Sequence, residues 1–152
     1  MAKPIRRAIL AAAAGLALSV GAIASMPVPH RSGGVSVEDF AEMRQQASAY
    51  SLELVLAARG SGAYLADVDV TVRSLPSRSV VLEHRTQGPL LLAALPPGHY
   101  ELTASFSDVL PGAATTLTRV VNVPRRGLVR TVVYFDTGDE VGSESAAAVR
   151  LN

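Results

Sequence analysis

The segment Leu95–Phe106, with the sequence LPPGHYELTASF, guides the interpretation of the whole chain. Pro96, Pro97 and Gly98 favour a turn, because proline fixes φ and glycine allows conformations that other residues avoid. After the turn, apolar and polar residues alternate with the period of a strand that has one buried and one exposed face. The apolar positions are Tyr100, Leu102, Ala104 and Phe106. The segment therefore predicts a turn followed by a β-strand.

Six further segments predict strands bounded by turn residues. They are Ser51–Ala58, Tyr64–Arg73, Ser79–His84, Leu90–Leu95, Thr115–Val123 and Leu128–Phe135. Within the second, Val68, Val70 and Val72 alternate with polar residues, whereas Leu90–Leu95 is apolar throughout and favours a central strand covered on both faces. Seven short strands separated by frequent turns predict an all-β, seven-stranded sandwich over residues 50–136.

The first 24 residues have the organisation of a secretory signal peptide. Their basic residues are Lys3, Arg6 and Arg7. An apolar stretch over 8–20 follows, which we expect to be helical, and then small residues at Ala22 and Ala24. We predict Sec-type export, cleavage after Ala24 and a periplasmic or secreted location. Two alternatives are a twin-arginine signal built on Arg6 and Arg7 and an uncleaved membrane anchor.

Residues 25–49 are expected to form a linker and a short amphipathic helix. The Pro- and Gly-containing stretch 25–36 predicts a flexible mature N-terminus. Ser36 is a candidate N-cap for a helix over 36–49, with acidic residues in the first turn. Its apolar face would carry Val37, Phe40, Met43 and Ala47. We expect this helix to pack on the edge or end of the sandwich, with a partner-binding helix as the alternative. Residues 137–152 predict a flexible tail.

Composition excludes several kinds of chemistry. The chain has no cysteine, which rules out disulfides, thiolate nucleophiles and cysteine-ligated zinc. Removing residues 1–24 takes away three of 14 basic groups, which leaves 11 against 13 acidic groups and a net charge of −2. A mildly acidic protein is a poor candidate for nonspecific nucleic-acid binding.

The three histidines, His30, His84 and His99, form no local HxH or HxxxH pair that could supply two metal ligands. We interpret them as surface residues and predict no metal, no cofactor and no catalytic residue. The glycines that flank Ser61 are interpreted as turn residues, because no G-x-S-x-G motif surrounds this serine.

Charged residues also gather in several places. The acidic residues Asp67 and Asp69 lie on a predicted strand, and Asp136, Asp139 and Glu140 follow the last strand. We interpret both groups as solvated, because calcium needs six to eight oxygen ligands from a tight loop. A local basic patch could include Arg119, Arg125, Arg126 and Arg130.

Several segments together resemble a known family. They are Ala63–Arg73 (AYLADVDVTVR), Gly88–Leu92 (GPLLL), Leu95–Phe106 and Arg119–Val123 (RVVNV). In this order, before a closing apolar strand, they resemble the carboxypeptidase regulatory-like domain of the prealbumin (transthyretin-like) superfamily over residues 50–135. Where that family often has an Asp-Gly-aromatic turn, residues 86–89 read TQGP, which suggests a divergent bacterial periplasmic form.

The resemblance implies a prealbumin-like (Ig-like) accessory sandwich that does not act as a catalyst. A related hydrolase of purine breakdown ends in Tyr-Arg-Gly-Ser, whereas this chain ends in Val149–Asn152 (VRLN), so that activity is not carried over.

Three functions follow as hypotheses. The first is a non-enzymatic exported domain that binds a protein or a cell-envelope component, with no nucleic acid and with membrane contact only through an uncleaved signal. The second is a carbohydrate- or small-ligand-binding module, for which Tyr50, Tyr64 and Tyr134 are the aromatic candidates. The third is a small hydrolase, for which no activated nucleophile is evident.

Overall fold

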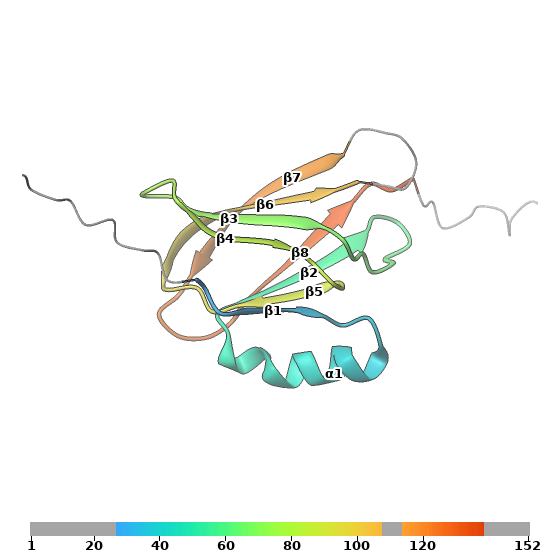
Figure 1. Cartoon of the computed structure of the whole chain (residues 1–152), viewed down its shortest axis with the longest axis horizontal. Coiled ribbons are helices and arrows are strands. Elements are labelled where there is room, and N and C mark those ends of the chain that lie inside the picture. The colour runs from blue at the N-terminus through green and yellow to red at the C-terminus, as the bar shows by residue number, and fades with distance from the viewer. Residues whose placement is uncertain (1–26, 108–113, 139–152) are drawn as a thin grey trace, which may run out of the picture.

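The computed structural model describes residues 27–107 and 114–138, which form eight strands, one α-helix and a short 3₁₀ helix (Figure 1). The strands are β1 (His30–Gly33), β2 (Leu52–Ala58), β3 (Asp69–Ser74), β4 (Val80–Arg85), β5 (Leu90–Ala93), β6 (Gly98–Phe106), β7 (Thr115–Val123) and β8 (Val129–Phe135). The helices are α1 (Val37–Gln46) and η1 (Ala47–Ala49). The predicted signal peptide over 1–24 and nearly all of the predicted tail lie outside the described residues.

The strands form two four-stranded sheets that pack as a sandwich. Sheet A has the order β1-β5-β2-β8, and sheet B has the order β4-β3-β6-β7. Neighbouring strands are antiparallel except β2 and β8, which pair in parallel over the whole of β2. The all-β sandwich predicted from the alternation is confirmed at the level of fold class.

Between the sheets lies one apolar core, to which both sheets contribute alternate residues. It includes Leu52, Leu54 and Leu56 of β2, Val70 and Val72 of β3, Tyr100, Leu102 and Ala104 of β6, and Val133 and Phe135 of β8. The alternation around Leu95–Phe106 thus identifies its strand correctly, and β6 occupies the centre of sheet B between β3 and β7. The turn before β6 is closed by the Tyr100 hydroxyl, which donates to the Pro96 carbonyl oxygen at 2.8 Å. Burial raises the pKa of Tyr100.

Helix α1 covers the outer face of sheet A, as Figure 1 shows. Ser36 is its N-cap, because its Oγ accepts the Asp39 amide at 3.1 Å. Beneath the helix, a second apolar cluster contains Met43, Ala47, Val55, Leu90 and Leu92. The helix therefore lies across a sheet face, and the prediction of an edge or end position is wrong. Since α1 and sheet B cover β5 from both sides, all four residues of β5 are buried, which confirms its predicted central position.

Two predictions about the first half of the chain are also wrong. The strand count is eight and not seven, because His30–Gly33 forms a strand at the edge of β5, within the segment expected to be flexible. The strand predicted to begin at Tyr64 begins at Asp69, and Tyr64 instead makes an isolated antiparallel bridge with Ala57. None of the helices in the described residues is long and apolar enough to cross a membrane.

Candidate interaction surface

Exposed apolar side chains gather where β1 leads into α1. Val35 is 76% exposed, Val37 is 82% exposed and Tyr64 is 59% exposed, and a cluster of such residues is more informative than single exposed ones. With Phe40 they surround a cavity of about 200 Å³. We call these four residues the apolar patch. Val37 was expected on the apolar face of the helix with Phe40, Met43 and Ala47, but it is the first helical residue and is exposed, so it does not pack with Met43 and Ala47.

Local backbone geometry brings the two sides of the apolar patch together. Gly34 adopts φ +87, a conformation that favours glycine, and this lets the chain turn from β1 into the helix. On the other side, the turn after β2 brings Tyr64 onto Phe40, so that the two rings stack with centroids 5.2 Å apart and 27° between their planes. The Arg44 guanidinium lies 5.9 Å from the centre of the Phe40 ring. The ring pair therefore fixes the cavity wall without needing a ligand.

Two of the three candidate tyrosines lie in one row across sheet A. Ala57 of β2 bridges Tyr64 on one side and pairs with Tyr134 of β8 on the other. Laterally paired residues point to the same face, and each strand spacing is about 4.8 Å, so the two tyrosines stand about 10 Å apart on the outer face. Both are exposed. Tyr50, by contrast, is half-buried against the cluster beneath α1 and is not available as a platform.

A charged group that sequence reasoning missed lies beside this row. Glu53 of β2 is fully buried on the outer face of sheet A, under α1. The Arg130 guanidinium of β8 donates to both of its oxygens, at 3.0 and 3.1 Å, and Arg44 of α1 approaches at 3.9 Å. Hydrogen bonding and the charge of Glu53 raise the pKa of Arg130. Arg130 therefore belongs to this ion pair, whereas Arg125 and Arg126 lie exposed in the turn before β8.

The structure brings two of the three histidines together at the junction of the sheets. The rings of His30 in β1 and His84 in β4 lie 4.7 Å apart, and His84 Nε2 is 2.7 Å from the Ser32 hydroxyl. Burial, and then the charge of His30, lower the pKa of His84. His84 is thus partly buried, whereas His30 and His99 are exposed.

The Ser32–His84 contact has the atoms of a nucleophile and its base, but its surroundings favour a structural role. The Ser32 hydroxyl also accepts the Gln87 amide at 3.1 Å, so it joins β1, β4 and the turn after β4. Within 27–107 and 114–138, no carboxylate bonds to His84 to orient it, as a catalytic triad requires. The same residues contain no group of three or more His, Cys, Asp or Glu side chains that could hold a metal.

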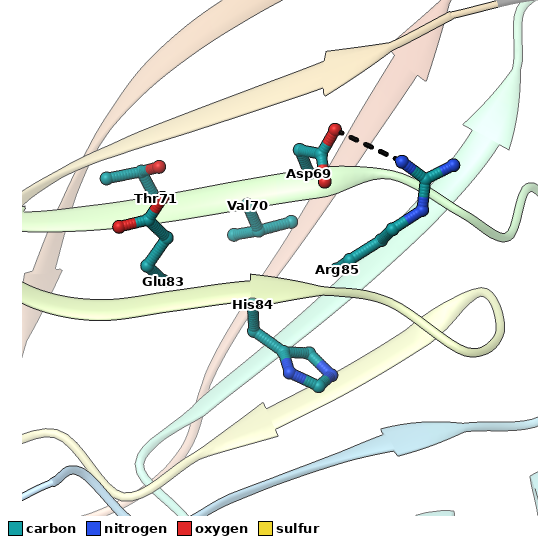
Figure 2. Close-up of a pocket in the computed structure, with 6 residues that line it drawn as sticks. All are labelled: Asp69, Val70, Thr71, Glu83, His84 and Arg85. Atoms are coloured by element: carbon teal, nitrogen blue, oxygen red, sulfur yellow. Dashed lines mark ion pairs between the residues drawn. The ribbon is translucent and has the colours of Figure 1, made fainter.

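A polar pocket of about 290 Å³ lies between β3 and β4 (Figure 2). Asp69, Thr71, Glu83 and Arg85 point outward from sheet B, while His84 points toward sheet A. Arg85 forms ion pairs with Asp69 at 3.6 Å and with Asp67 at 3.4 Å. The two acidic residues therefore balance a cation of their own chain, which agrees with their interpretation as solvated. Asp67 itself precedes β3 and has φ 58, so it does not lie on the strand as expected.

The remaining candidates have ordinary surroundings. Ser61 accepts the Ala63 amide at 3.2 Å inside the turn after β2, as its interpretation as a turn residue requires. Asp136 follows β8, whereas Asp139 and Glu140 lie outside the described residues.

No family model, curated protein or solved structure matches the chain. The class of protein is therefore defined by the structure alone, as a two-sheet β-sandwich with one helix across its outer face and an apolar patch at the start of that helix.

Proposed function

We propose that this chain is a non-enzymatic exported accessory domain that binds a protein partner, which could be a component of the cell envelope, through the apolar patch. The observation that carries the proposal is the exposure of Val35, Val37 and Tyr64 around one cavity. Exposed apolar residues that cluster beside a cavity are typical of protein-binding surfaces. The signal-like residues 1–24 support export to the periplasm or beyond. The segments that resemble the carboxypeptidase regulatory-like domain support an accessory role, with this chain as a divergent bacterial relative of that domain.

The physical reasoning for a protein partner rests on the rigidity of the patch. The Phe40–Tyr64 stack and the turn at Gly34 hold the apolar side chains in place before any partner arrives. A preformed surface loses little conformational entropy on binding, and aromatic residues contribute strongly to binding energy in such positions.

The test uses affinity capture from a periplasmic and envelope fraction, with chemical crosslinking to locate the contact. Val37→Asp removes one apolar side chain, and an acidic residue in the first helical turn is compatible with the helix. The matched control is Val120→Asp, which alters another exposed valine, on β7. We expect a partner that the wild-type chain and Val120→Asp recover equally and that Val37→Asp loses. A partner retained by Val37→Asp, or none above background, would contradict the proposal.

A second candidate function is carbohydrate or small-ligand binding, and the tyrosine row supports it. Two exposed rings about 10 Å apart could stack on successive units of a ligand chain. A glycan array tests this candidate directly. Binding that is lost in both Tyr64→Ala and Tyr134→Ala would favour it over a protein partner, and an array without signal would remove it.

A further inference from the structure

His30 and His84 meet where β1, an edge strand of sheet A, lies beside β4, an edge strand of sheet B. Their ring centroids are 4.7 Å apart, with 62° between the ring planes. His30 is exposed and His84 is partly buried. Figure 2 shows the His84 ring pointing away from the outer face of sheet B and toward sheet A. Two imidazoles from distant parts of the sequence therefore share one place that a dissolved ion can reach.

Each of these rings is held through one nitrogen. His30 Nδ1 lies 2.8 Å from the Val28 carbonyl oxygen, which can only accept, so Nδ1 carries the proton and Nε2 keeps its lone pair. His84 Nε2 lies 2.7 Å from the Ser32 hydroxyl, whose oxygen can accept from this ring as well as from the Gln87 amide. Among the residues that the structure describes, neither His30 Nε2 nor His84 Nδ1 makes a hydrogen bond. A histidine with one N–H donated to an oxygen and its other nitrogen available has the usual surroundings of a metal ligand.

The separation of the rings fits one metal ion between them. Metal–nitrogen bonds to histidine are about 2.0–2.1 Å long, so an ion in the plane of the ring lies about 3.2 Å from its centroid. Two rings at that distance, with centroids 4.7 Å apart, meet at the ion with an angle of about 95°. This angle is close to that between neighbouring ligands of a square-planar ion, and it is smaller than the tetrahedral angle typical of zinc. Since His30 is exposed, its ring can turn toward the ion without displacing packed side chains.

We propose that His30 Nε2 and His84 Nδ1 bind one Cu²⁺ ion, with water in the remaining positions. Imidazole is a suitable ligand for copper, and a given nitrogen site binds Cu²⁺ more tightly than the other divalent first-row metals. A metal binds the neutral form of histidine. Because burial and the charge of His30 lower the pKa of His84, this ring is neutral at pH 7. The ion would link the edge of one sheet to the edge of the other, and the site uses none of the residues of the apolar patch.

Isothermal titration calorimetry with CuCl₂ tests the site on the purified full-length chain, prepared without a histidine tag. We expect one Cu²⁺ per chain, with saturation below about 100 μM. His30→Ala and His84→Ala should each weaken binding about tenfold or more, and Ser32→Ala, which removes the partner of His84 Nε2, about tenfold. His99→Ala alters the third histidine, exposed on sheet B, and is the matched control that should bind as the wild-type chain does. A titration with ZnCl₂ should give weaker binding than CuCl₂.

Electron paramagnetic resonance of the Cu²⁺-loaded chain identifies the ligands independently. The spectrum of the wild-type chain should show coupling to two imidazole nitrogens, and that of His30→Ala to one. Thermal unfolding provides a third measurement, because an ion that binds only the folded chain raises its unfolding temperature. Cu²⁺ should raise this temperature in the wild-type chain and in His99→Ala, but not in His30→Ala. Since His30 is exposed, His30→Ala is the decisive variant if His84→Ala does not fold.

Four results would overturn the proposal. They are no saturable binding of Cu²⁺ up to about 100 μM, undiminished binding in His30→Ala, a spectrum without nitrogen coupling, and tighter binding of Zn²⁺ than of Cu²⁺. The capture experiment with Val37→Asp reads a different surface and uses no metal. The proposed function can therefore fail while the copper site stands, and the reverse.

Discussion

Sheets A and B use the same strand geometry but cover their outer faces differently. The outer face of sheet A lies under α1 and contains Val55, Leu90, Leu92 and the buried Glu53. The outer face of sheet B is open and carries polar side chains such as those of the pocket in Figure 2. As a result, β2 and β5 are buried along their whole length, whereas β3 alternates between buried and partly exposed positions.

The difference shows that a helix over a sheet face changes how much a charged side chain on that face contributes to stability. A carboxylate on the outer face of sheet B can be solvated, so its ion pairs contribute little. On sheet A, the same group is removed from water and must be satisfied by its partner. Substitutions at equivalent places on the two sheets should therefore have unequal effects.

The largest contrast is expected between two arginines. Arg130→Ala leaves the buried Glu53 without its two-oxygen partner, with only Arg44 at 3.9 Å beside it, and should lower the free energy of unfolding by more than Arg85→Ala does. Arg85→Ala removes exposed ion pairs on sheet B and should cost about 0–1 kcal/mol. Urea denaturation followed by circular dichroism measures both. Equal losses would mean that the cover over Glu53 has no energetic consequence.

The next contrast involves two glycines. A Cβ at Gly88, beside sheet A, would overlap the carbonyl group of Gly33. Because this group belongs to the backbone, it cannot move aside easily. Gly88→Ala should therefore cost about 1–3 kcal/mol or more. A Cβ at Gly98 of sheet B would meet only the Tyr100 ring, at 3.6 Å, an ordinary contact. Gly98→Ala should cost nothing or even stabilise by about 0.4–1 kcal/mol. Thermal unfolding of the two variants measures the difference, and a Gly98→Ala variant less stable than Gly88→Ala would contradict the prediction.

The helix that covers sheet A depends on its N-cap. Ser36→Ala removes the acceptor of the Asp39 amide and should cost about 1 kcal/mol. The control is Ser105→Ala on sheet B, whose hydroxyl bonds to Thr116 on the surface and whose loss should stay within about 0.5 kcal/mol. Chemical denaturation of both variants checks the difference, and a harmless Ser36→Ala would indicate that packing alone places the helix.

The smallest expected effect concerns pH, at the junction of the two sheets. The pKa of His84 lies below its ordinary value of 6.5 in the folded chain. As the pH falls, His84 therefore takes up a proton in the unfolded chain before it does so in the folded chain. The free energy of unfolding should decrease as the pH drops from about 6.5 to the lowered pKa, and should stay constant below it. His84→Gln should reduce this slope. Urea titrations between pH 7 and 5 measure the slope, and an unchanged slope in His84→Gln would contradict the assignment.

Local sequence patterns predicted much of the fold. Three elements could be predicted because their signals depend on neighbours in the chain. These signals are the alternation at Val70 and Val72, the apolar run of β5 and the N-cap at Ser36. β1 could not be predicted, since HRSG has no strand periodicity and pairs only because β5 offers an edge. The position of the helix, the burial of Glu53 and the Ser32–His84 contact depend on residues far apart in the sequence, and no local pattern reports them.

The apolar patch was only partly predictable. Tyr64 was identified as an exposed aromatic residue, and Phe40 and Val37 as apolar helix residues. Their meeting requires the bridge between Tyr64 and Ala57, which the sequence pattern had placed within a longer strand. Gly60 and Gly62 precede Tyr64 and indicated a tight turn at this place. Their positive φ values bring Tyr64 back beside β2.

The parallel pairing of β2 with β8 sets the order in which the molecule can be completed. Glu53 and Arg130 are 77 positions apart, so the carboxylate has no bidentate partner until almost the last strand has been synthesised. Closing a contact of this separation is slow compared with forming local hairpins. Within the described residues, sheet A can therefore be completed only after the chain has been synthesised through Phe135, whereas β3, β4 and β6 of sheet B can pair earlier.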